Sequence, residues 1–184
     1  MLSSGFPKGA SFFRPVWPLD TVHPFFPFYY ASVATDRRDA MVVELREVNA
    51  QTVRAVCALG VAPEQDEFVA SNALSIAQAH FEPNHWMRAI FAGDEPAGFL
   101  LTKEDRQRPL YYLWRFMIDE KYQRRGIGRR AMTLLLDRWR SLGAAEGVLS
   151  VIEENGSAIA FYESLGFWLT GERAGDELVM RVQL

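Results

Sequence analysis

The residues with the clearest potential for chemistry in this 184-residue chain begin with a short arginine- and glycine-rich stretch. Residues 123–130 read QRRGIGRR, and they open an amphipathic helical pattern. The start of a helix offers unpaired N–H groups and the positive end of a dipole. Glycines allow an anion to approach the backbone closely. The stretch therefore predicts an anion-binding site, with a pyrophosphate as its natural ligand.

Three glycine-rich motifs compete for this stretch. The P-loop pattern GxxxxGK[ST] is absent. Residues 126–131 match the Rossmann pattern GxGxxA, and Glu153 and Glu154 follow the next expected strand, where a ribose carboxylate would lie. However, seven residues separate these glycines from the preceding strand, and too little chain follows to build the remaining βα units. The third pattern, Q/R-x-x-G-x-G/A after a buried strand, is matched by residues 123–128.

The elements that must position the glycine turn are a strand before it and a helix after it. Residues 110–118 (LYYLWRFMI) are apolar and aromatic, with Arg115 as the only charge. Such a run is typical of a strand that is covered on both faces. From Ile127 to Leu142, apolar residues recur at helical spacing. We therefore expect a buried strand, a charged loop, the glycine turn and an amphipathic helix, in that order.

A second stretch, NGSAIAFYESLGF over residues 155–167, follows the first with one expected strand between them. Together the two stretches resemble the coenzyme A motif and the following N-x-x-A-x-x-x-Y-x-x-x-G-F segment of the GNAT superfamily of N-acetyltransferases. The resemblance covers roughly residues 41–184. Residues 113–123 (LWRFMIDEKYQ) and 80–101 (HFEPNHWMRAIFAGDEPAGFLL) look most like bacterial diamine and spermidine N-acetyltransferases.

This resemblance implies a function and a fold. The implied enzyme transfers acetyl from acetyl-CoA to a primary amine by direct attack in a ternary complex, and a diamine or polyamine such as putrescine, spermidine or spermine is favoured. The implied fold is α/β (α+β), with a mixed, mostly antiparallel sheet that is flanked by helices and splayed at the central buried strand. The pattern of the chain gives the order βααβββαβαββ. Its expected elements are strands 42–48, 86–92, 97–102, 110–118, 146–152, 167–173 and 177–182, helices 52–59, 69–81, 127–142 and 155–165, and a charged loop over 103–109.

The resemblance also assigns the coenzyme A contacts residue by residue. The end of the buried strand would pair through its backbone with the pantetheine arm, and the N–H of Met117 or Ile118 would polarise the thioester carbonyl. Asn155 would cap its helix and hydrogen-bond the same arm. The full set of expected coenzyme A contacts is Phe116, Met117, Ile118, Gln123, Arg124, Arg125, Gly126, Ile127, Gly128, Arg129, Asn155 and Tyr162.

Catalysis requires an acid for the leaving thiolate and a base for the amine. Tyr162 matches the family position whose phenol points at the coenzyme A sulfur, where it can hydrogen-bond or protonate the thiolate. The acceptor ammonium, with a pKa near ~10, must lose a proton before it attacks. Some relatives carry a glutamate on the buried strand for this purpose, but Trp114 and Arg115 stand there in this chain. We therefore expect Glu82, or a water relay, to serve as the base.

The acceptor site is predicted from the early acidic residues and from three aromatic residues, Trp86, Trp114 and Tyr112. Carboxylates would hold a polycation and the aromatic rings would contact it by cation–π interaction; ordinary surface acids and core packing are the competing interpretations. The expected acceptor contacts are Glu64, Asp66, Glu67, Glu82, Trp86 and Trp114. Other acceptors that fit the same chemistry are an aminoglycoside, an amino acid or a protein N-terminus. A regulatory acyl-CoA-binding module without turnover and a nicotinamide enzyme are the alternatives from other classes.

Composition excludes several further classes. The net charge of −3 implies no broad basic surface for nucleic acid. The single cysteine, Cys57, rules out an intramolecular disulfide framework, so we expect a cytoplasmic protein with Cys57 in the core. The three histidines lack zinc-ligand spacing, so no metal is expected. No apolar run reaches the ~18 residues of a membrane span. Homodimers are common among the relatives that the chain resembles, and the sequence leaves the oligomeric state open.

Residues 1–40 differ in composition from the rest of the chain. They contain five of the nine prolines and nine of the 24 aromatic residues. Residues 25–30 are apolar but too short and too interrupted by proline for a signal peptide. We expect either an extension that is disordered or loosely draped over the domain, or a segment that is not translated, since Met41 opens a plausible first strand. A flap over the substrate cleft or a dimer surface is the alternative.

Overall fold

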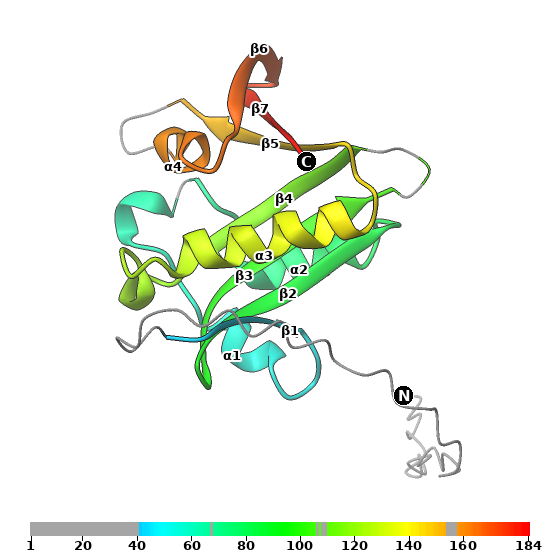
Figure 1. The fold of residues 1–184 in the computed structure, drawn as a ribbon. Helices are drawn as coiled ribbons and strands as arrows, with labels where there is room; N and C mark the ends of the chain where they lie inside the picture. Colours follow the sequence, from blue (N-terminus) through cyan, green and yellow to red (C-terminus); the bar gives the residue numbers. More distant parts are fainter. Residues whose placement is uncertain (1–40, 67, 106, 108–109, 154–157) are drawn as a thin grey trace, which may run out of the picture. The chain divides into compact units, whose positions relative to one another are not determined.

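The structure is a computed structural model that describes residues 41–66, 68–105, 107, 110–153 and 158–184. In this part of the chain, seven strands form one sheet in the order β1-β2-β3-β4-β5-β7-β6, with helices on both faces (Figure 1). All neighbouring strands are antiparallel except β4 and β5, which are parallel. The predicted fold class and element order are confirmed. Residues 1–40 lie outside the described residues, so the predicted domain boundary stays a prediction.

The first half of the sheet is a three-stranded antiparallel unit with two helices inserted. Its elements are β1 (Val43–Glu47), α1 (Val53–Cys57), a short 3₁₀ turn (Pro63–Gln65), α2 (Asn72–Ala79), β2 (His85–Ala92) and β3 (Glu95–Glu104). Helix α2 begins three residues later than expected. The cause is a cap, because the side-chain oxygen of Ser71 accepts a hydrogen bond from the backbone N–H of Leu74 at 3.3 Å.

The second half contains the predicted strand, turn and helix. Its elements are β4 (Leu110–Ile118), a 3₁₀ turn (Glu120–Tyr122), α3 (Ile127–Ser141), β5 (Glu146–Ile152), α4 (Ile159–Glu163), β6 (Trp168–Ala174) and β7 (Glu177–Gln183). Strands β4 and β5 have the bounds expected from the sequence. Gly166 follows α4 with φ of 92°, a conformation that glycine adopts without strain.

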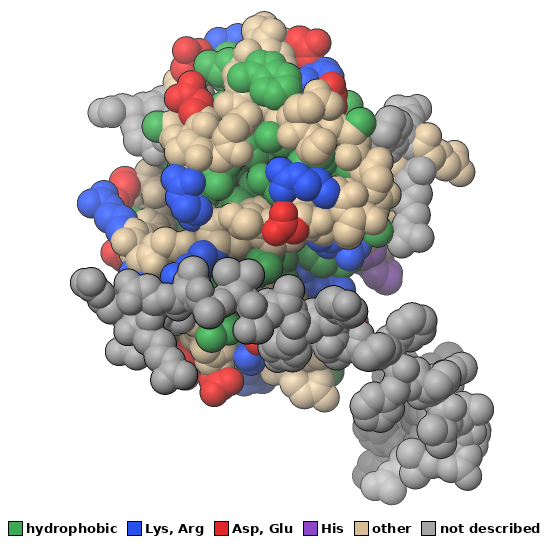
Figure 2. All heavy atoms as spheres, viewed as in Figure 1, with side chains coloured by type: hydrophobic (Ala, Val, Ile, Leu, Met, Phe, Trp, Pro, Cys, Tyr) green, Lys and Arg blue, Asp and Glu red, His purple; other side chains and the backbone are tan. Residues whose placement is uncertain are grey.

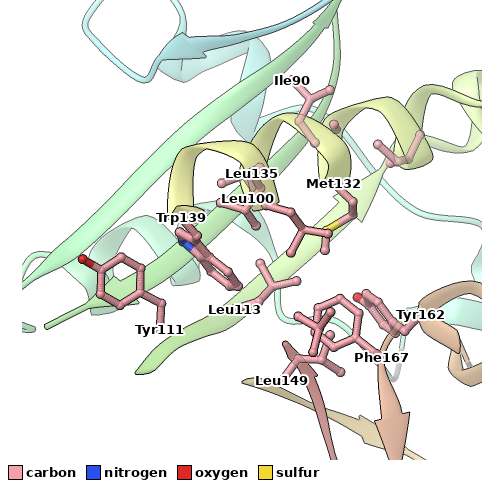
Figure 3. Close-up of a cluster of buried hydrophobic side chains, with 14 of the residues drawn as sticks. Ile90, Leu100, Tyr111, Leu113, Met132, Leu135, Trp139, Leu149, Tyr162 and Phe167 are labelled. Carbon is pink, nitrogen blue, oxygen red and sulfur yellow. The ribbon is translucent and has the colours of Figure 1, made fainter. Parts of the chain in front are cut away.

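Two hydrophobic clusters cover the two faces of the sheet. The larger one packs α3 and α4 against the sheet, and it includes Leu135 and Trp139 of α3 and Tyr162 of α4 (Figure 3). The smaller one packs α1 and α2 against the other face, and it includes Val56 and Ala79. Strand β4 contributes residues to both clusters, so the prediction that it is covered on both faces is confirmed.

Strand β4 separates from β5 halfway along its length. The two strands pair from Leu110–Leu113 with Glu146–Leu149, and the ladder ends there. At the same point the pairing of β4 with β3 shifts, because Leu101 pairs with Arg115 while Thr102 pairs with Leu113. Trp114 is therefore the extra residue of a β-bulge, which bends the strand. Strand β5 continues beside β7 instead, which confirms the predicted splay.

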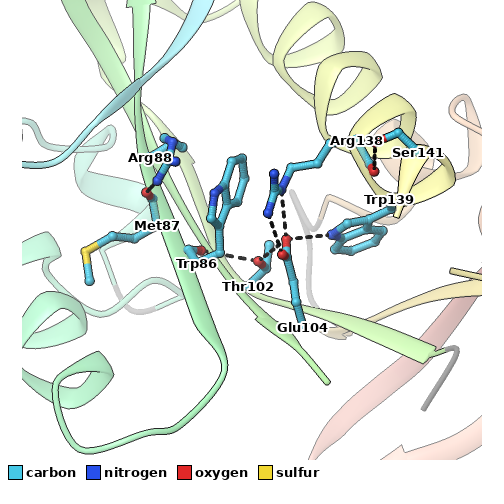
Figure 4. Close-up of polar contacts among 8 residues, drawn as sticks. All are labelled: Trp86, Met87, Arg88, Thr102, Glu104, Arg138, Trp139 and Ser141. Carbon is cyan, nitrogen blue, oxygen red and sulfur yellow. Dashed lines mark hydrogen bonds and ion pairs between the residues drawn. The ribbon is translucent and has the colours of Figure 1, made fainter. Parts of the chain in front are cut away.

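The predicted charged loop over 103–109 is wrong at its start, because β3 extends to Glu104. Glu104 is buried, and its carboxylate accepts hydrogen bonds from Arg138 (2.8 Å), Trp139 Nε1 (3.2 Å) and Thr102 Oγ1 (3.0 Å) (Figure 4). These partners satisfy the charge, so the residue can stay inside the fold. Arg138 and Trp139 come from α3, and the local sequence around Glu104 gives no sign of them.

Two further observations concern the surface. Cys57 is exposed, so the expectation that it belongs to the core is wrong. It ends α1, and the core-facing position of this short helix is Val56. No helix in the described part of the chain is long and apolar enough to cross a membrane.

Candidate active site

A cavity of about 900 Å³ opens where β4 and β5 separate. Its walls come from β4 and β5, from the glycine turn and the start of α3, from α4, and from the segment that precedes α2. The molecular face that carries α3 shows basic and acidic side chains interspersed rather than one basic field (Figure 2). The cationic character of the cavity is therefore local and comes from the few arginines that line it.

The sheet divides the lining of this cavity into two sides. Leu113, Leu149 and Tyr162 belong to the core cluster under α3 and α4, and we call their side the α3 side. Trp114 and Met117 pack with the cluster under α1 and α2, and we call theirs the α2 side. Because successive residues of a strand point to opposite faces, the neighbours of Leu113 and Leu149 belong to the α2 side. The cavity is thus accessible to two different sets of side chains.

The glycine turn lies on the α3 side. Arg124 and Gly126 adopt positive φ values of 59° and 76°, which curl the backbone ahead of α3. Helix α3 begins after Gly126 with no side-chain cap, so its first N–H groups are available to a ligand. A Cβ at Gly128 would lie 3.4 Å from Cγ1 of Ile118, so this glycine sits close against the end of β4. The turn has the geometry of a phosphate site.

The arginines of the turn differ in what they contact. Arg124 lines the cavity and has no hydrogen-bond or ion-pair partner among the residues described. Arg129 also lines the cavity, but its guanidinium donates to the carbonyl (3.0 Å) and hydroxyl (2.7 Å) of Ser164 after α4. Arg125 lies over the Tyr122 ring at 5.6 Å and does not line the cavity. The structure therefore brings Arg124 and Arg129 to the cavity.

Two other residues of the predicted coenzyme A set have structural partners. The amide nitrogen of Gln123, at the cavity wall, donates to the Ile118 carbonyl (2.9 Å) and to Gln65 Oε1 (2.7 Å). Both amide hydrogens are thereby engaged, so Gln123 ties the turn to β4. Ile127 is a core residue with 1% exposure. Phe116, Met117, Ile118, Gly126 and Gly128 line the cavity, and Asn155 lies outside the described residues.

Tyr162 lines the cavity from α4 and is only 7% exposed. Its ring makes edge contacts with Phe161 and Phe167, at centroid distances of 5.2 and 5.7 Å. Tyr162 and Phe167 lie side by side in Figure 3. Burial raises the pKa of the Tyr162 phenol above its ordinary value, because the anion would be poorly solvated there. The phenol therefore keeps its proton at neutral pH and can donate a hydrogen bond into the cavity.

Most of the predicted acceptor residues do not line the cavity. Glu82 pairs with Lys103 at 3.1 Å, and that lysine lies over the Trp114 ring. Trp86 stacks on Arg138 at 4.0 Å, next to the Glu104 cluster (Figure 4). Glu64 and Asp66 are exposed on either side of Gln65, which does line the cavity. Trp114 lines the cavity, and Glu67 lies outside the described residues.

The sequence interpretation missed a hydrogen-bonded chain on the α2 side. Tyr112 of β4 contacts Ser150 of β5 through the two hydroxyl oxygens at 2.8 Å, and Ser150 donates to Glu177 of β7. All three residues line the cavity. The one available signal was Ser150, a polar residue within the apolar strand EGVLSVI. The described residues contain no group of three or more His, Cys, Asp or Glu side chains that could hold a metal ion.

Comparisons of the sequence and of the fold with known proteins find N-acetyltransferases. The model of the Acetyltransferase (GNAT) family matches residues 44–167. The spermine/spermidine N(1)-acetyltransferase of Bacillus subtilis (strain 168) is 27% identical over 142 residues, which cover 72% of this chain and 91% of that protein. The [ribosomal protein bS18]-alanine N-acetyltransferase of Escherichia coli (strain K12) is 44% identical over 102 residues, which cover 49% and 68% respectively. The crystal structure of PaiA N-acetyltransferase from Thermoplasma acidophilum in complex with coenzyme A superimposes with a TM-score of 0.62 at 16% identity, covering 78% of this chain and all of that one.

Proposed function

Because the chain belongs to the GNAT acetyltransferase family and is an N-acetyltransferase that uses acetyl-CoA, we propose that the cavity between β4 and β5 is its active site. The acceptor is a primary amine that attacks the thioester directly in a ternary complex. The observation that carries this proposal is the separation of β4 from β5 after Leu113 and Leu149. Within the described part of the chain, it leaves backbone groups of β4 without a partner on the β5 side, near a helix start that has no side-chain cap.

The residues of the α3 side suit the coenzyme. The turn presents N–H groups at the start of α3, and Arg124, which has no partner among the described residues, for the pyrophosphate; Arg129 adds positive charge. The end of β4, at Met117 and Ile118, supplies backbone groups for the pantetheine arm and an N–H for the thioester carbonyl. When bound, acetyl-CoA supplies the activated acyl group and a thiolate leaving group. These contacts involve backbone atoms, so side-chain substitutions at Met117 and Ile118 leave them in place.

Tyr162 is the acid in this proposal. Its phenol lies in the cavity with a pKa raised by burial, so it stays protonated throughout the neutral range. A neutral phenol can donate a hydrogen bond to the departing thiolate and protonate it. Its ring is fixed between Phe161 and Phe167, which limits the orientations of the hydroxyl.

For the acceptor we keep a diamine or polyamine as the first candidate. The Bacillus subtilis relative that acts on spermine and spermidine matches over most of both chains. Glu64 and Asp66 flank Gln65 at the cavity wall, where they would attract the distal cations of such a substrate. Glu82 and Trp86 do not support this role, because each is engaged with other side chains away from the cavity lining.

A peptide α-amine is the second candidate. The Escherichia coli relative that acts on a ribosomal protein alanine has the higher identity, although over a shorter segment. The α2 side also carries apolar and cationic residues, including Phe68, Trp114 and Arg115. Such a wall suits a peptide with one amine better than a substrate with several positive charges.

The test is release of coenzyme A thiol from acetyl-CoA in the presence of putrescine, spermidine, spermine, lysine, an aminoglycoside or a short peptide with a free N-terminus. We expect turnover with at least one amine, and a higher rate of thiol release with spermidine than with the peptide. Preference for the peptide would replace the first candidate by the second. Tight acetyl-CoA binding without thiol release on any amine would contradict the proposed site and favour a regulatory acyl-CoA-binding module.

A further inference from the structure

One carboxylate lies on the α2 side of the cavity. Glu177 is the first residue of β7, and it is the single acid among the cavity-lining residues that the structure describes. Its register partner is Ile152, at the end of β5 that has already separated from β4. Leu178, Met180 and Val182 face the core under α3, so strand alternation places Glu177 on the opposite side. It therefore lies opposite the side that carries the glycine turn and Tyr162.

Two hydroxyl groups orient this carboxylate. An ionised carboxylate only accepts hydrogen bonds, so the Ser150 hydroxyl donates a hydrogen bond to Glu177. The oxygen of Ser150 is then free to accept, and the Tyr112 hydroxyl donates to it at 2.8 Å. The three residues come from β4, β5 and β7, and their chain of hydrogen bonds spans the strand separation. Ser150 engages one carboxylate oxygen, which leaves the other for a further donor.

Glu177 differs from the neighbouring acids in lacking a cation. Glu146 and Glu172 pair with Arg181, and Glu153 pairs with Arg173. Within the described part of the chain, Glu177 has no ion-pair partner. A carboxylate at a cavity wall with an open oxygen and no protein cation is a suitable site for a cationic ligand.

We propose that Glu177 binds the acceptor ammonium and takes its proton, and that Ser150 is its positioning residue. This inference rests on the proposed function, since it assigns the base of the same reaction. It replaces Glu82, whose carboxylate is paired with Lys103 outside the cavity lining. It also gives the two sides of the cavity separate tasks, with the acid Tyr162 on one and the base Glu177 on the other.

The proton balance of the reaction follows from these positions. One of the three ammonium protons moves to Glu177, and the nitrogen lone pair then forms the C–N bond with the thioester carbon. The C–S bond breaks, and its electron pair leaves with the sulfur. The sulfur takes a proton from the Tyr162 hydroxyl. The second nitrogen proton then restores the proton on Tyr162. The third proton stays on the amide product, and Glu177 releases its proton to solvent.

The other charged and titratable groups of the cavity favour this placement of the amine. They are Tyr112 and Arg115 from β4, Arg124 and Arg129 around the glycine turn, and Tyr162 from α4. All the charged members of this set are cationic, so they repel an ammonium. Glu177 is therefore the position in the described lining where a positive amine is electrostatically favoured.

The experiment compares Glu177→Gln with the wild-type enzyme, using spermidine and the best amine of the panel as probes. The glutamine can still hydrogen-bond Ser150, so the change removes the charge and the basicity alone. At pH 7.5 we expect kcat/KM for the amine to fall about 100-fold, the scale of general-base catalysis. The defect should shrink about tenfold per pH unit towards the amine pKa near ~10, where free amine replaces the missing base. The acetyl-CoA Kd should stay within about twofold, since Glu177 lies on the opposite side.

The control variant is Glu153→Gln, which removes an exposed carboxylate near the end of β5 that is paired with Arg173. It should keep wild-type kcat/KM at every pH. Glu177→Asp should recover part of the activity, because it restores a carboxylate on a shorter side chain. Ser150→Ala should lower kcat/KM less than Glu177→Gln does. The ratio of its kcat/KM to the wild-type value should not change with pH, as expected for a positioning residue.

The outcomes separate this inference from the proposed function. Wild-type enzyme that binds acetyl-CoA but acetylates no amine overturns the proposed function and this inference with it. If the wild-type enzyme is active and the kcat/KM of Glu177→Gln at pH 7.5 is within about twofold of the wild-type value, the assignment of Glu177 is overturned and the proposed function stands. A defect that stays constant from pH 7 to pH 10, with no recovery in Glu177→Asp, also overturns it and indicates a structural role.

Discussion

Two glutamates on the same sheet show how differently one residue type can be used. Glu104, at the end of β3, is 9% exposed, and its two oxygens accept from Arg138, Trp139 and Thr102. Glu177, at the start of β7, accepts from Ser150 and faces the cavity. The first carboxylate has its acceptor capacity filled by the protein, whereas the second keeps capacity for a ligand. The comparison teaches that saturation of hydrogen bonds, rather than burial alone, separates a structural acid from a functional one.

The same contrast extends to the surroundings of the two residues. Around Glu104, Arg138 and Trp139 of α3 hydrogen-bond its carboxylate, and Trp86 covers Arg138 at 4.0 Å (Figure 4). Around Glu177, β4 and β5 separate and leave about 900 Å³ of space. Substitutions in the Glu104 cluster should therefore change the free energy of unfolding, and substitutions in the cavity should change rate or affinity.

The largest expected effect belongs to the cavity. Tyr162→Phe removes the phenol hydroxyl and keeps the ring contacts with Phe161 and Phe167. We expect kcat/KM to fall about 10²- to 10³-fold, the range of a lost general acid. The free energy of unfolding should change by less than about 1 kcal/mol. Steady-state thiol release and urea titration measure the two quantities, and a large loss of stability with little loss of rate would reverse the assignment.

The Glu104 cluster should show the opposite pattern. Glu104→Leu removes the common acceptor of Arg138 and Trp139, so the buried Trp139 N–H and the partly exposed Arg138 guanidinium both lose their partner. We expect a loss of about 3 kcal/mol, at the lower end for breaking a buried ion pair because Arg138 is partly exposed. At a temperature where the variant is folded, its kcat/KM should match the wild type. Conservative Glu104→Gln keeps part of the hydrogen bonding and should lose less stability.

The features of the fold and of the site that the sequence predicts are those set by residues that are neighbours in the chain. Residues 110–118 and 146–152 form strands with the expected bounds, because short, mainly apolar runs favour buried strands there. The glycine turn is confirmed as a turn. Its backbone needs a positive φ at Gly126 and a close approach to β4 at Gly128, and glycine allows both. The sequence predicts a loop at Glu104, because the partners that hold this residue in β3 lie 34 and 35 residues later on α3. Glu177 was missed because β7 comes to the cavity only through the sheet order.

A smaller effect separates two adjacent arginines. Arg124 lines the cavity without a partner among the residues described, whereas Arg125 lies over Tyr122 outside the lining. Arg124→Ala should raise the Kd for acetyl-CoA about tenfold, since it removes a charge-assisted contact. Arg125→Ala is the matched control and should change the Kd by less than about twofold. Isothermal titration at two salt concentrations measures both, and equal effects would mean that the turn acts as a diffuse basic surface.

The smallest expected effect concerns alkaline pH. Burial raises the pKa of Tyr162 in the folded chain above the unfolded value near ~10, so the folded state retains a proton that the unfolded state loses. The stability due to Tyr162 is therefore complete below pH 10 and is lost as the pH rises towards the folded pKa. At pH 11, wild type should lose about 1.4 kcal/mol that Tyr162→Phe does not lose. Urea titrations of both proteins at pH 9 and 11 test this, and parallel losses would contradict a protonated buried phenol.

The central claim is that the separation of β4 from β5 is the site of acetyl transfer, with acid and base on opposite sides. The most direct measurement is a crystal structure with a bisubstrate analogue, in which the coenzyme A sulfur is joined through an acetyl linker to a spermidine nitrogen. In that structure the pyrophosphate should lie on the turn at Arg124, the sulfur beside the Tyr162 hydroxyl, and the spermidine nitrogen opposite Glu177. A linker that lies outside the β4–β5 separation, or a spermidine nitrogen on the side away from Glu177, would contradict it.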